Sequence, residues 1–434
     1  MKYILQLIFL FCFAQNIFAQ PLPATKQTEA TLITDATIHV GNGKVIEHGI
    51  IGFADSKITL ISDMVSSNFD KNIYKKTISA AGKHIYPGLI APNTHLGLVE
   101  IEAARPTLDN VEVGDFNPSV RSIVAYNTDS HIIPTIRANG VLLAQVVPEG
   151  GRVSGSSSVV EIDGWNYEDA AHDLDNGMHI RFPRQLNNVF DGSDGFTAKK
   201  NEKYAKDVQE LESFMKDAQS YALRDITNIG TKNLKFEAMR GVFDGSKTLF
   251  VHVEQVKEMT EAVTMLSKYS NKIVIVGGRD SYMIADWLAN KKIGVILDRT
   301  QSLPAREDDD YDQPYKTPAQ LQKAGVVFAL STGQGWTNRN LPFMAGQTVA
   351  FGLTKEQALS AVTSNTAKLL GIDKTVGTLE VGKDATLTIC EGDILDMKSS
   401  VVTRAFIRGR DADLNNKQKE NAVRFQTKYD RLKK

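Results

Sequence analysis

The chain has few cysteines and no excess of charge of either sign. Only two of its 434 residues are cysteine, Cys12 and Cys390, so a framework of several disulfides is excluded. The 50 Lys and Arg residues and the 51 Asp and Glu residues leave a net charge of −1. A protein that neutralises a phosphate backbone needs a basic surplus, and no segment of the sequence offers one. We therefore expect no nucleic-acid partner.

Long apolar runs are also scarce, and the most prominent one stands at the N-terminus. Tyr3–Phe13 is apolar with one exception, follows a positively charged start and leads to Ala19. Because the run is too short to span a bilayer, it predicts a secretory signal peptide over residues 1–19 and no transmembrane span. We expect an exported protein, periplasmic or secreted, in which Cys390 is left as a lone thiol.

Short β-rich segments flank a longer middle region. Thr31–Val40 and Lys57–Ile61 lie near the N-terminus, and Ala385–Cys390 and Val401–Ile407 lie near the C-terminus. Each is bounded by turn residues, as strands usually are. The two flanks predict one small β-module that is assembled from both ends of the chain.

The middle region alternates apolar, β-branched runs with amphipathic segments. The clearest runs are Val141–Val147, Thr248–Val253, Lys272–Val276, Gly294–Leu297 and Val326–Leu330. Alternation of this kind predicts a parallel sheet covered by helices. The length of the region matches the ~250 residues of a typical (β/α)8 barrel.

The strongest motif, AGKHIYPGLIAPNTHLGL, covers Ala81–Leu98. Its Pro87-Gly88 turn opens an apolar strand that ends at Asn93 and His95, which alternation puts on one face. With Val376–Glu380 and Gly382–Ala385 near the C-terminus, the motif resembles the amidohydrolase superfamily, in particular its imidazolonepropionase-like branch.

The resemblance covers nearly all of residues 31–412 and implies a definite architecture. It is an α/β fold, a (β/α)8 TIM barrel over residues 87–375, with a composite β-sandwich from residues 20–86 and 376–412. Residues 413–434 are expected to form a C-terminal helix or tail. One helix is marked by the capping box of Thr354 and Gln357 and by a terminal Gly371.

The family's metal ligands are only partly present. The family has two histidines at the end of strand 1, where this chain has Asn93 and His95, and one at the end of strand 5, which His252 matches. The strand 6 histidine is replaced at Gly277, and the strand 8 aspartate at Gly333. Strand 4 is not defined by the sequence; His179 and Lys235 lie near it only in sequence.

Catalytic zinc is usually held by about three protein ligands and an open position for water. His95 and His252 supply two nitrogens, and the carbonyl of Asn93 suits harder cations better or lies beside a substrate. Replacement carboxylates are expected at strand ends, where barrel chemistry lies. The candidates for this role are Asp298, Asp280, Glu149 and Glu100.

Two further segments are open to a functional or a structural interpretation. Glu149–Ser158 has the glycine spacing of a phosphate loop but no following lysine, which excludes nucleotide binding; its Arg152 is expected either to contact a substrate carboxylate or to lie in a surface loop. The acidic run Glu307–Asp312 lacks the glycine and closing glutamate of a calcium loop, so a solvated loop is expected.

Two functions of different class follow. The first is an exported hydrolase of C–N bonds in a cyclic amide or small peptide, with a weakened or rebuilt site that holds one divalent metal, most simply zinc. The second is a catalytically inactive barrel that binds a small molecule, without a metal, or serves as the partner of an active paralogue. Homo-oligomerisation and assembly with a paralogue both stay open.

Overall fold

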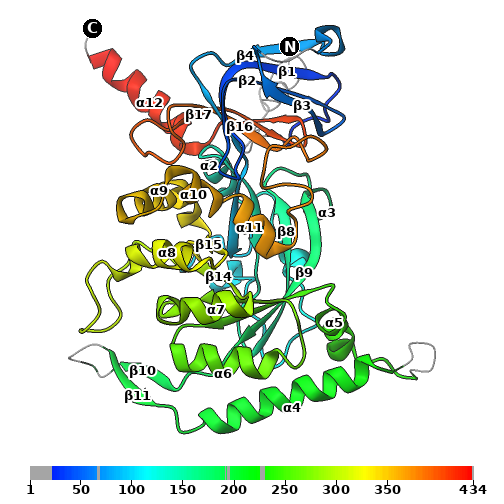
Figure 1. Ribbon diagram of the computed structural model, residues 1–434, viewed down its shortest axis with the longest axis vertical. Coiled ribbons are helices and arrows are strands. Elements are labelled where there is room, and N and C mark those ends of the chain that lie inside the picture. The colour runs from blue at the N-terminus through cyan, green and yellow to red at the C-terminus, as the bar shows by residue number, and fades with distance from the viewer. Residues whose placement is uncertain (1–21, 66–68, 191, 193–195, 225–229, 433–434) are drawn as a thin grey trace, which may run out of the picture.

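The computed structural model describes residues 22–65, 69–190, 192, 196–224 and 230–432, so the predicted signal peptide lies outside the described residues. Two eight-stranded sheets dominate the described chain, and Figure 1 shows one of them at the top of the molecule and the other below it, in the middle. None of the described helices is both long and apolar enough to cross a membrane.

One of these two sheets is the predicted barrel, and its strands follow the chain in order. They are β6 (Leu89–Thr94), β7 (Val141–Val146), β8 (Val153–Glu161), β9 (Ala171–Arg181), β12 (Thr248–Val253), β13 (Ile273–Gly277), β14 (Gly294–Leu297) and β15 (Phe328–Leu330). Buried Val, Ile, Leu and Phe side chains from these strands form one continuous core with the helices around them. The helices are α2 (Ile133–Arg137), α3 (Tyr167–Ala170), α4 (Tyr204–Ala222), α5 (Leu234–Phe243), α6 (Val256–Leu266), α7 (Ala285–Lys291), α8 (Gln313–Ala324), α9 (Leu341–Gln347), α10 (Lys355–Ser360) and α11 (Ser364–Leu370).

One barrel strand, β8, runs against its neighbours. It pairs antiparallel with both β7 and β9, whereas the other neighbouring pairs of the barrel are parallel. A short connection without a helix joins β7 to β8, and such a connection can only return the chain antiparallel. The segment that the sequence indicated as a loop at 149–158 is therefore largely a strand, and all nine residues of β8 are buried.

The serines of β8 explain why the sequence did not mark it as a strand. Ser157 accepts a hydrogen bond from Gln145 Nε2 (3.1 Å) and lies 3.2 Å from Asn176 Oδ1, all inside the barrel. Lys247 Nζ donates to Ser156 Oγ at 3.1 Å. These hydroxyls are buried but hydrogen-bonded, so their burial costs little free energy.

A break in the expected helix at 354–370 closes the barrel. The capping box of Thr354 and Gln357 is confirmed, but the helix divides into α10 and α11. At the break, the carbonyl of Ala361 accepts from Leu330 N in β15 and that of Val362 accepts from Ile90 N in β6. The two backbone carbonyls thus bridge the last strand and the first, which a continuous helix could not do.

The second sheet confirms that both ends of the chain build one β-module. Its strands hydrogen-bond in the order β18-β17-β16-β5-β1-β2-β3, and β4 also pairs with β1. The bounds are β1 (Thr31–His39), β2 (Val45–Ala54), β3 (Lys57–Asp63), β4 (Lys76–Ser79), β5 (His84–Pro87), β16 (Leu387–Glu391), β17 (Val401–Ile407) and β18 (Arg410–Ala412). A separate apolar core, with Phe53 packed edge-on against Phe406, holds this sheet together.

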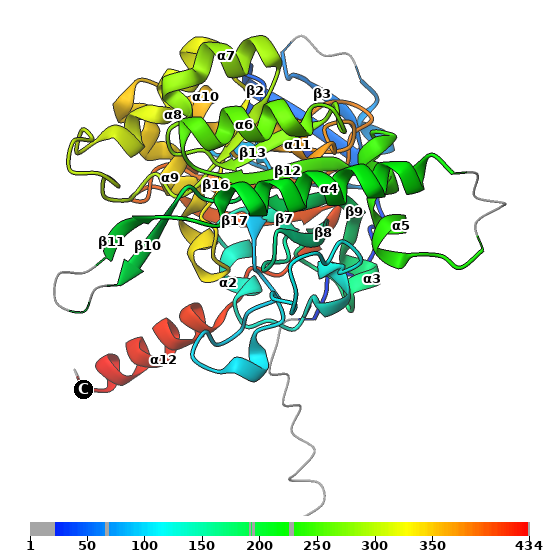
Figure 2. The same cartoon turned by 90° about the horizontal axis from the view of Figure 1, so that it is seen from below.

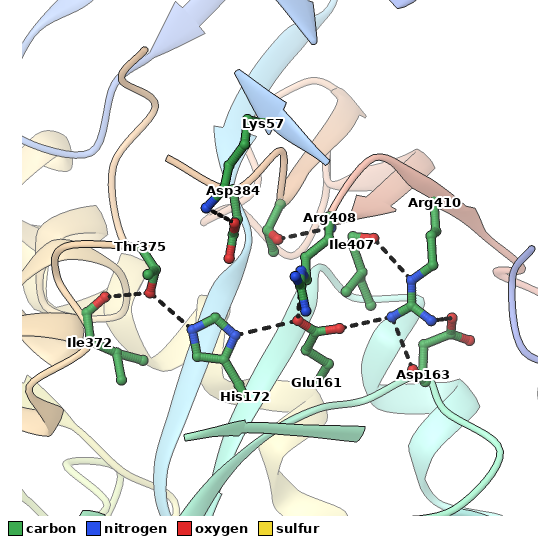
Figure 3. A network of polar contacts seen from close by, with 11 residues as sticks. Lys57, Glu161, Asp163, His172, Ile372, Thr375, Asp384, Ile407, Arg408 and Arg410 are labelled. Carbon is green, nitrogen blue, oxygen red and sulfur yellow. Dashed lines mark hydrogen bonds and ion pairs between the residues drawn. The ribbon is translucent and has the colours of Figure 1, made fainter. Parts of the chain in front are cut away.

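Buried charges join the module to the barrel (Figure 3). Glu161, at the end of β8, accepts from Arg410 Nη2 at 2.8 Å and lies 3.3 Å from His172 Nδ1. Asp163 accepts from Arg137 Nη1 at 3.1 Å, and Arg410 Nη1 lies 3.5 Å from its other oxygen. The C-terminal helix α12 (Lys417–Leu432) extends beyond this junction, and none of its residues is buried (Figure 2).

Candidate functional site

A cavity of about 520 Å³ opens at the carboxyl ends of the barrel strands, where chemistry on this fold is usually located. The side chains reach it from the ends of β6, β7, β9, β12 and β14 or from the loops that follow. The polar and glycine residues that line it are Asn93, His95, Glu102, Asn110, Glu149, Arg181, His252, Asp298, Gly333 and Gln334. The structure therefore brings together five residues that the sequence indicated at the site: Asn93, His95, Glu149, His252 and Asp298.

Glu149 is at the centre of the hydrogen bonding in this cavity. Its Oε1 accepts from Arg181 Nη2 at 2.7 Å and lies 3.3 Å from His95 Nε2, and its Oε2 accepts from Asn110 Nδ2 at 3.2 Å. Burial alone would raise the pKa of Glu149, but the contacts and charges of His95 and Arg181 outweigh burial and lower it to about 2. Glu149 is therefore a carboxylate at neutral pH.

His252, which lines the cavity and is partly buried, pairs with the buried His179 of the neighbouring strand. His252 Nε2 lies 2.9 Å from His179 Nδ1, and His179 stacks on Phe250. Burial lowers the pKa of His179 to about 3, with a further decrease from the charge of Arg181. Burial and Arg181 also lower the pKa of His252 well below its usual value. Both rings are therefore neutral and one donates to the other.

Asn93 adopts a backbone conformation that few residues tolerate. Its φ is +49°, in the left-handed region where asparagine is enriched. Its N–H donates to Gln145 Oε1 at 3.1 Å, and its carbonyl accepts from Ser331 Oγ at 3.2 Å. These two bonds fasten the end of β6 to β7 and to the segment after β15, and the side chain of Asn93 borders the cavity.

The residues present do not fit a zinc site. Among the described residues, no group of three or more His, Cys, Asp and Glu side chains converges as metal ligands would. The Nε2 atoms of His95 and His252 are both directed to protein partners, Glu149 and His179. The charge of the Arg181 guanidinium acts on His252, His179, Glu149 and Asp298. A metal ion among these residues would be repelled by this fixed positive charge.

A carboxyl group that the sequence did not indicate fills the space of the lost strand 6 ligand. A Cβ at Gly277 would lie 2.3 Å from Glu254 Oε1, so the Glu254 carboxyl lies directly over this glycine. Burial, followed by the charge of Asp298, raises the pKa of Glu254 to about 7, so this carboxyl holds a proton more readily than an ordinary glutamate does.

Gly277→Ala tests the placement of Glu254. Gly277 has φ +92°, so alanine adds backbone strain of about 1–3 kcal/mol and also displaces the carboxyl, which accepts from Arg279 N at 3.1 Å. Gly382→Ala is the matched control, because Gly382 has φ +90° and open space around it. We expect Gly277→Ala to lose about 1 kcal/mol more in urea unfolding than the control. Equal losses would show that Glu254 is not held over Gly277.

Other residues that the sequence indicated lie away from the cavity. Arg152 is held by Asp115, Asp207 and Glu210, with N···O distances of 2.8–3.0 Å. Asp280 is buried and accepts hydrogen bonds from the two terminal nitrogens of Arg306, Nη1 and Nη2. Glu100 accepts from Asn127 Nδ2 at 3.3 Å, and Lys235 is exposed in the first turn of α5.

Three residues of the site were missed or left unassigned by sequence reasoning. Arg181 ends β9, a strand that the sequence left undefined, and a charged residue near the end of the partly apolar segment 178–182 was the available signal. His179 was known as a histidine near strand 4, but its contact with His252 depends on the register of β9 against β12. Glu254 follows β12 outside any family motif, so no pattern pointed to it.

A barrel with its cavity at the carboxyl strand ends and an attached sheet from both chain ends defines the amidohydrolase-like class of proteins. The chain matches the model of the amidohydrolase family over residues 191–423, more than half of its length, and it belongs to that family. Amidohydrolase tasK from Hapsidospora irregularis is 29% identical over 116 residues, which cover 24% of this chain and only 11% of that protein.

Solved structures share the fold over most of the chain. An amidohydrolase from Thermotoga maritima MSB8 has a TM-score of 0.75 at 22% identity, over 88% of this chain and 99% of that one. A Xaa-Pro dipeptidase with bound methionine has 0.54 at 15% identity, over 88% and 100%. An adenosine deaminase from Xanthomonas campestris with bound zinc has 0.52 at 16%, over 95% and 100%. At these identities the likeness shows the fold alone.

Proposed function

We propose that this member of the family binds a small amide or short peptide at an arginine–carboxylate centre that takes the place of the family's metal centre. The observation that carries the proposal is the position of Arg181. Its side chain is 34% exposed and lines the cavity, and only its Nη2 has a partner among the described residues, Glu149. A guanidinium group with a free donor beside a cavity favours an acceptor on a ligand, such as an amide carbonyl or a carboxylate.

Zinc content tests this proposal directly. We expect the purified protein to take up no stoichiometric zinc in equilibrium dialysis, because Arg181 repels the ion and His95 and His252 contact protein partners. The variant Asn93→His/Gly333→Asp restores two family ligands, and a Cβ at Gly333 meets no atom within 4 Å. We expect this variant to gain measurable zinc only when Arg181→Gln is added.

Gly382→Asp, an acidic residue at a glycine of similar φ far from the cavity, is the control for the added charge. Stoichiometric zinc in the unmodified protein, lost in His95→Ala, would overturn the proposal.

The second candidate is hydrolysis of a C–N bond in such a ligand with a rebuilt site. Asp298 favours it, because it lines both this cavity and the neighbouring one, and a carboxyl group placed beside a bound amide can transfer a proton as a general acid or base. The test is turnover of a panel of dipeptides, N-acyl amino acids and cyclic amides. Turnover that is lost in Asp298→Asn supports hydrolysis, and no turnover leaves binding as the function.

Export is part of the same proposal and is supported by the sequence of residues 1–19. Expression of the full chain in a Gram-negative host, followed by fractionation, is expected to place a shortened protein outside the cytoplasm. A variant that lacks residues 2–19 is the control and is expected to stay inside. Retention of the full-length, uncleaved chain in the cytoplasm would contradict export.

A further inference from the structure

A second cavity, of about 650 Å³, adjoins the first, and Asp298 lines both. It lies over the ends of β13 and β14, between the loop after β9 and the segment at 298–306. Four arginines line it: Arg184, Arg279, Arg299 and Arg306. Apart from Asp298, the proposed function uses no residue of this cavity.

Two of the four arginines are committed to internal ion pairs. Arg306 contacts Asp280 and Asp309 with N···O distances of 3.0 and 2.9 Å, and Arg279 Nε lies 3.4 Å from Asp280 Oδ1. By contrast, Arg184 and Arg299 form no ion pair and no side-chain hydrogen bond with any residue that the structure describes. Both are exposed at the cavity wall, so their guanidinium donors are available to a ligand.

The charge of Arg184 acts on Glu254, Glu258 and Asp298, but none of these carboxyls forms an ion pair with Arg184 or Arg299. Glu254 accepts from the backbone N–H of Arg279, and Glu258, which is buried, accepts from the backbone N–H of Gln185 at 2.6 Å. Asp298 stands at the junction with the first cavity. The arginine side of the cavity therefore presents two guanidinium groups without a direct carboxylate partner among the described residues, and each matches a carboxylate in shape and charge.

We propose that the second cavity binds the carboxylate of the ligand through Arg184 and Arg299, so that the ligand is an N-acylated amino acid or a short peptide with a free C-terminus. This inference rests on the proposed function. The order of groups in such a ligand matches the order of residues along the two cavities. Its acyl carbonyl faces Arg181, its amide N–H faces Asp298, and its carboxylate faces the two arginines.

The test compares acids with their neutral amides. Hippurate, N-acetylphenylalanine and glycylglycine are titrated calorimetrically into the full chain, each beside its C-terminal carboxamide. We expect at least one acid to bind on the order of tenfold or more tightly than its carboxamide, because charge-assisted hydrogen bonds contribute about 1.5–3 kcal/mol each. That preference should disappear in Arg184→Gln/Arg299→Gln. Arg424→Gln, in the exposed helix α12, should keep it.

The outcomes separate this inference from the proposed function. Equal affinity for acids and carboxamides, or an acid preference that survives Arg184→Gln/Arg299→Gln, overturns the carboxylate site and leaves the Arg181 centre intact. The proposed function and the carboxylate site are both supported if binding is lost in Arg181→Gln and the acid preference is lost in Arg184→Gln/Arg299→Gln. If no acid or carboxamide binds, both are overturned.

Discussion

Replacement of Asp163 by alanine is expected to lower the free energy of unfolding by about 3–5 kcal/mol, since it leaves a buried guanidinium without its carboxylate. Arg137 and Asp163 have 4% and 1% of their side chains exposed, and Arg137 Nη1 lies 3.1 Å from Asp163 Oδ1. The remaining contacts of Arg137, from Nε to the carbonyl of Asp413 and from Nη1 to that of Ile162, carry no full charge. Burial lowers the pKa of Arg137, and the variant removes the largest charge that opposes this effect, which leaves the weaker one of Asp413.

Urea unfolding followed by circular dichroism measures this effect. Glu202→Ala is the matched control, because the Lys200–Glu202 pair has 77% and 78% of its side chains exposed and should contribute under about 1 kcal/mol. The double variant Arg137→Met/Asp163→Leu removes both charges and should regain much of the loss. A loss for Asp163→Ala no larger than the control would show that the junction does not depend on this pair.

Arg181→Gln is expected to weaken binding of a small amide or peptide on the order of 10- to 100-fold, because it removes a charge-assisted hydrogen bond from a partly enclosed site. It also leaves Glu149 with its remaining contacts to His95 and Asn110. Since Glu149 and Arg181 are 33% and 34% exposed, we expect only a modest loss of stability. A large change in affinity with a small change in stability identifies a binding role.

Calorimetric dissociation constants measure the first quantity, and the urea midpoint measures the second. Arg181→Lys keeps the charge but not the planar fork, so its affinity should be intermediate. Arg121→Gln is the control, because Arg121 pairs with Asp175 outside the cavity. Unchanged affinity in Arg181→Gln would remove the centre of the proposed function.

The apolar strands could be predicted from the sequence, and the polar one could not. β12, β13 and β14 consist of Val, Ile, Leu and Phe with a few exceptions, and their burial on both faces produces the continuous runs that mark them. β8 has buried serines at 154 and 156–158. Three of them, Ser156, Ser157 and Ser158, have partners in β7, in β9 and just before β12, and those partners are visible only once the strands are aligned.

Sequence reasoning predicted the site residues that belong to a family motif. It missed those that reach the site only through contacts between strands. His95 and His252 follow from the family pattern at strand ends. Arg181, Glu254 and His179 take part through atoms brought together from different strands, as in the contact of His179 with His252 on the next strand. The loss of the ligands at Gly277 and Gly333 could be predicted, but not the carboxyl of Glu254 over Gly277.

The reversed strand β8 has a consequence for the folding pathway. Because β7, β8 and β9 follow one another as an antiparallel meander, this part of the barrel forms from contacts that are local in sequence. Closure of the barrel, in contrast, joins Ser331 to Pro92 across 239 residues. Loop closure over such a distance is slow compared with hairpin formation. In pulse-labelled hydrogen exchange during refolding, we expect amides of β8 and β9 to become protected before those of β6 and β15.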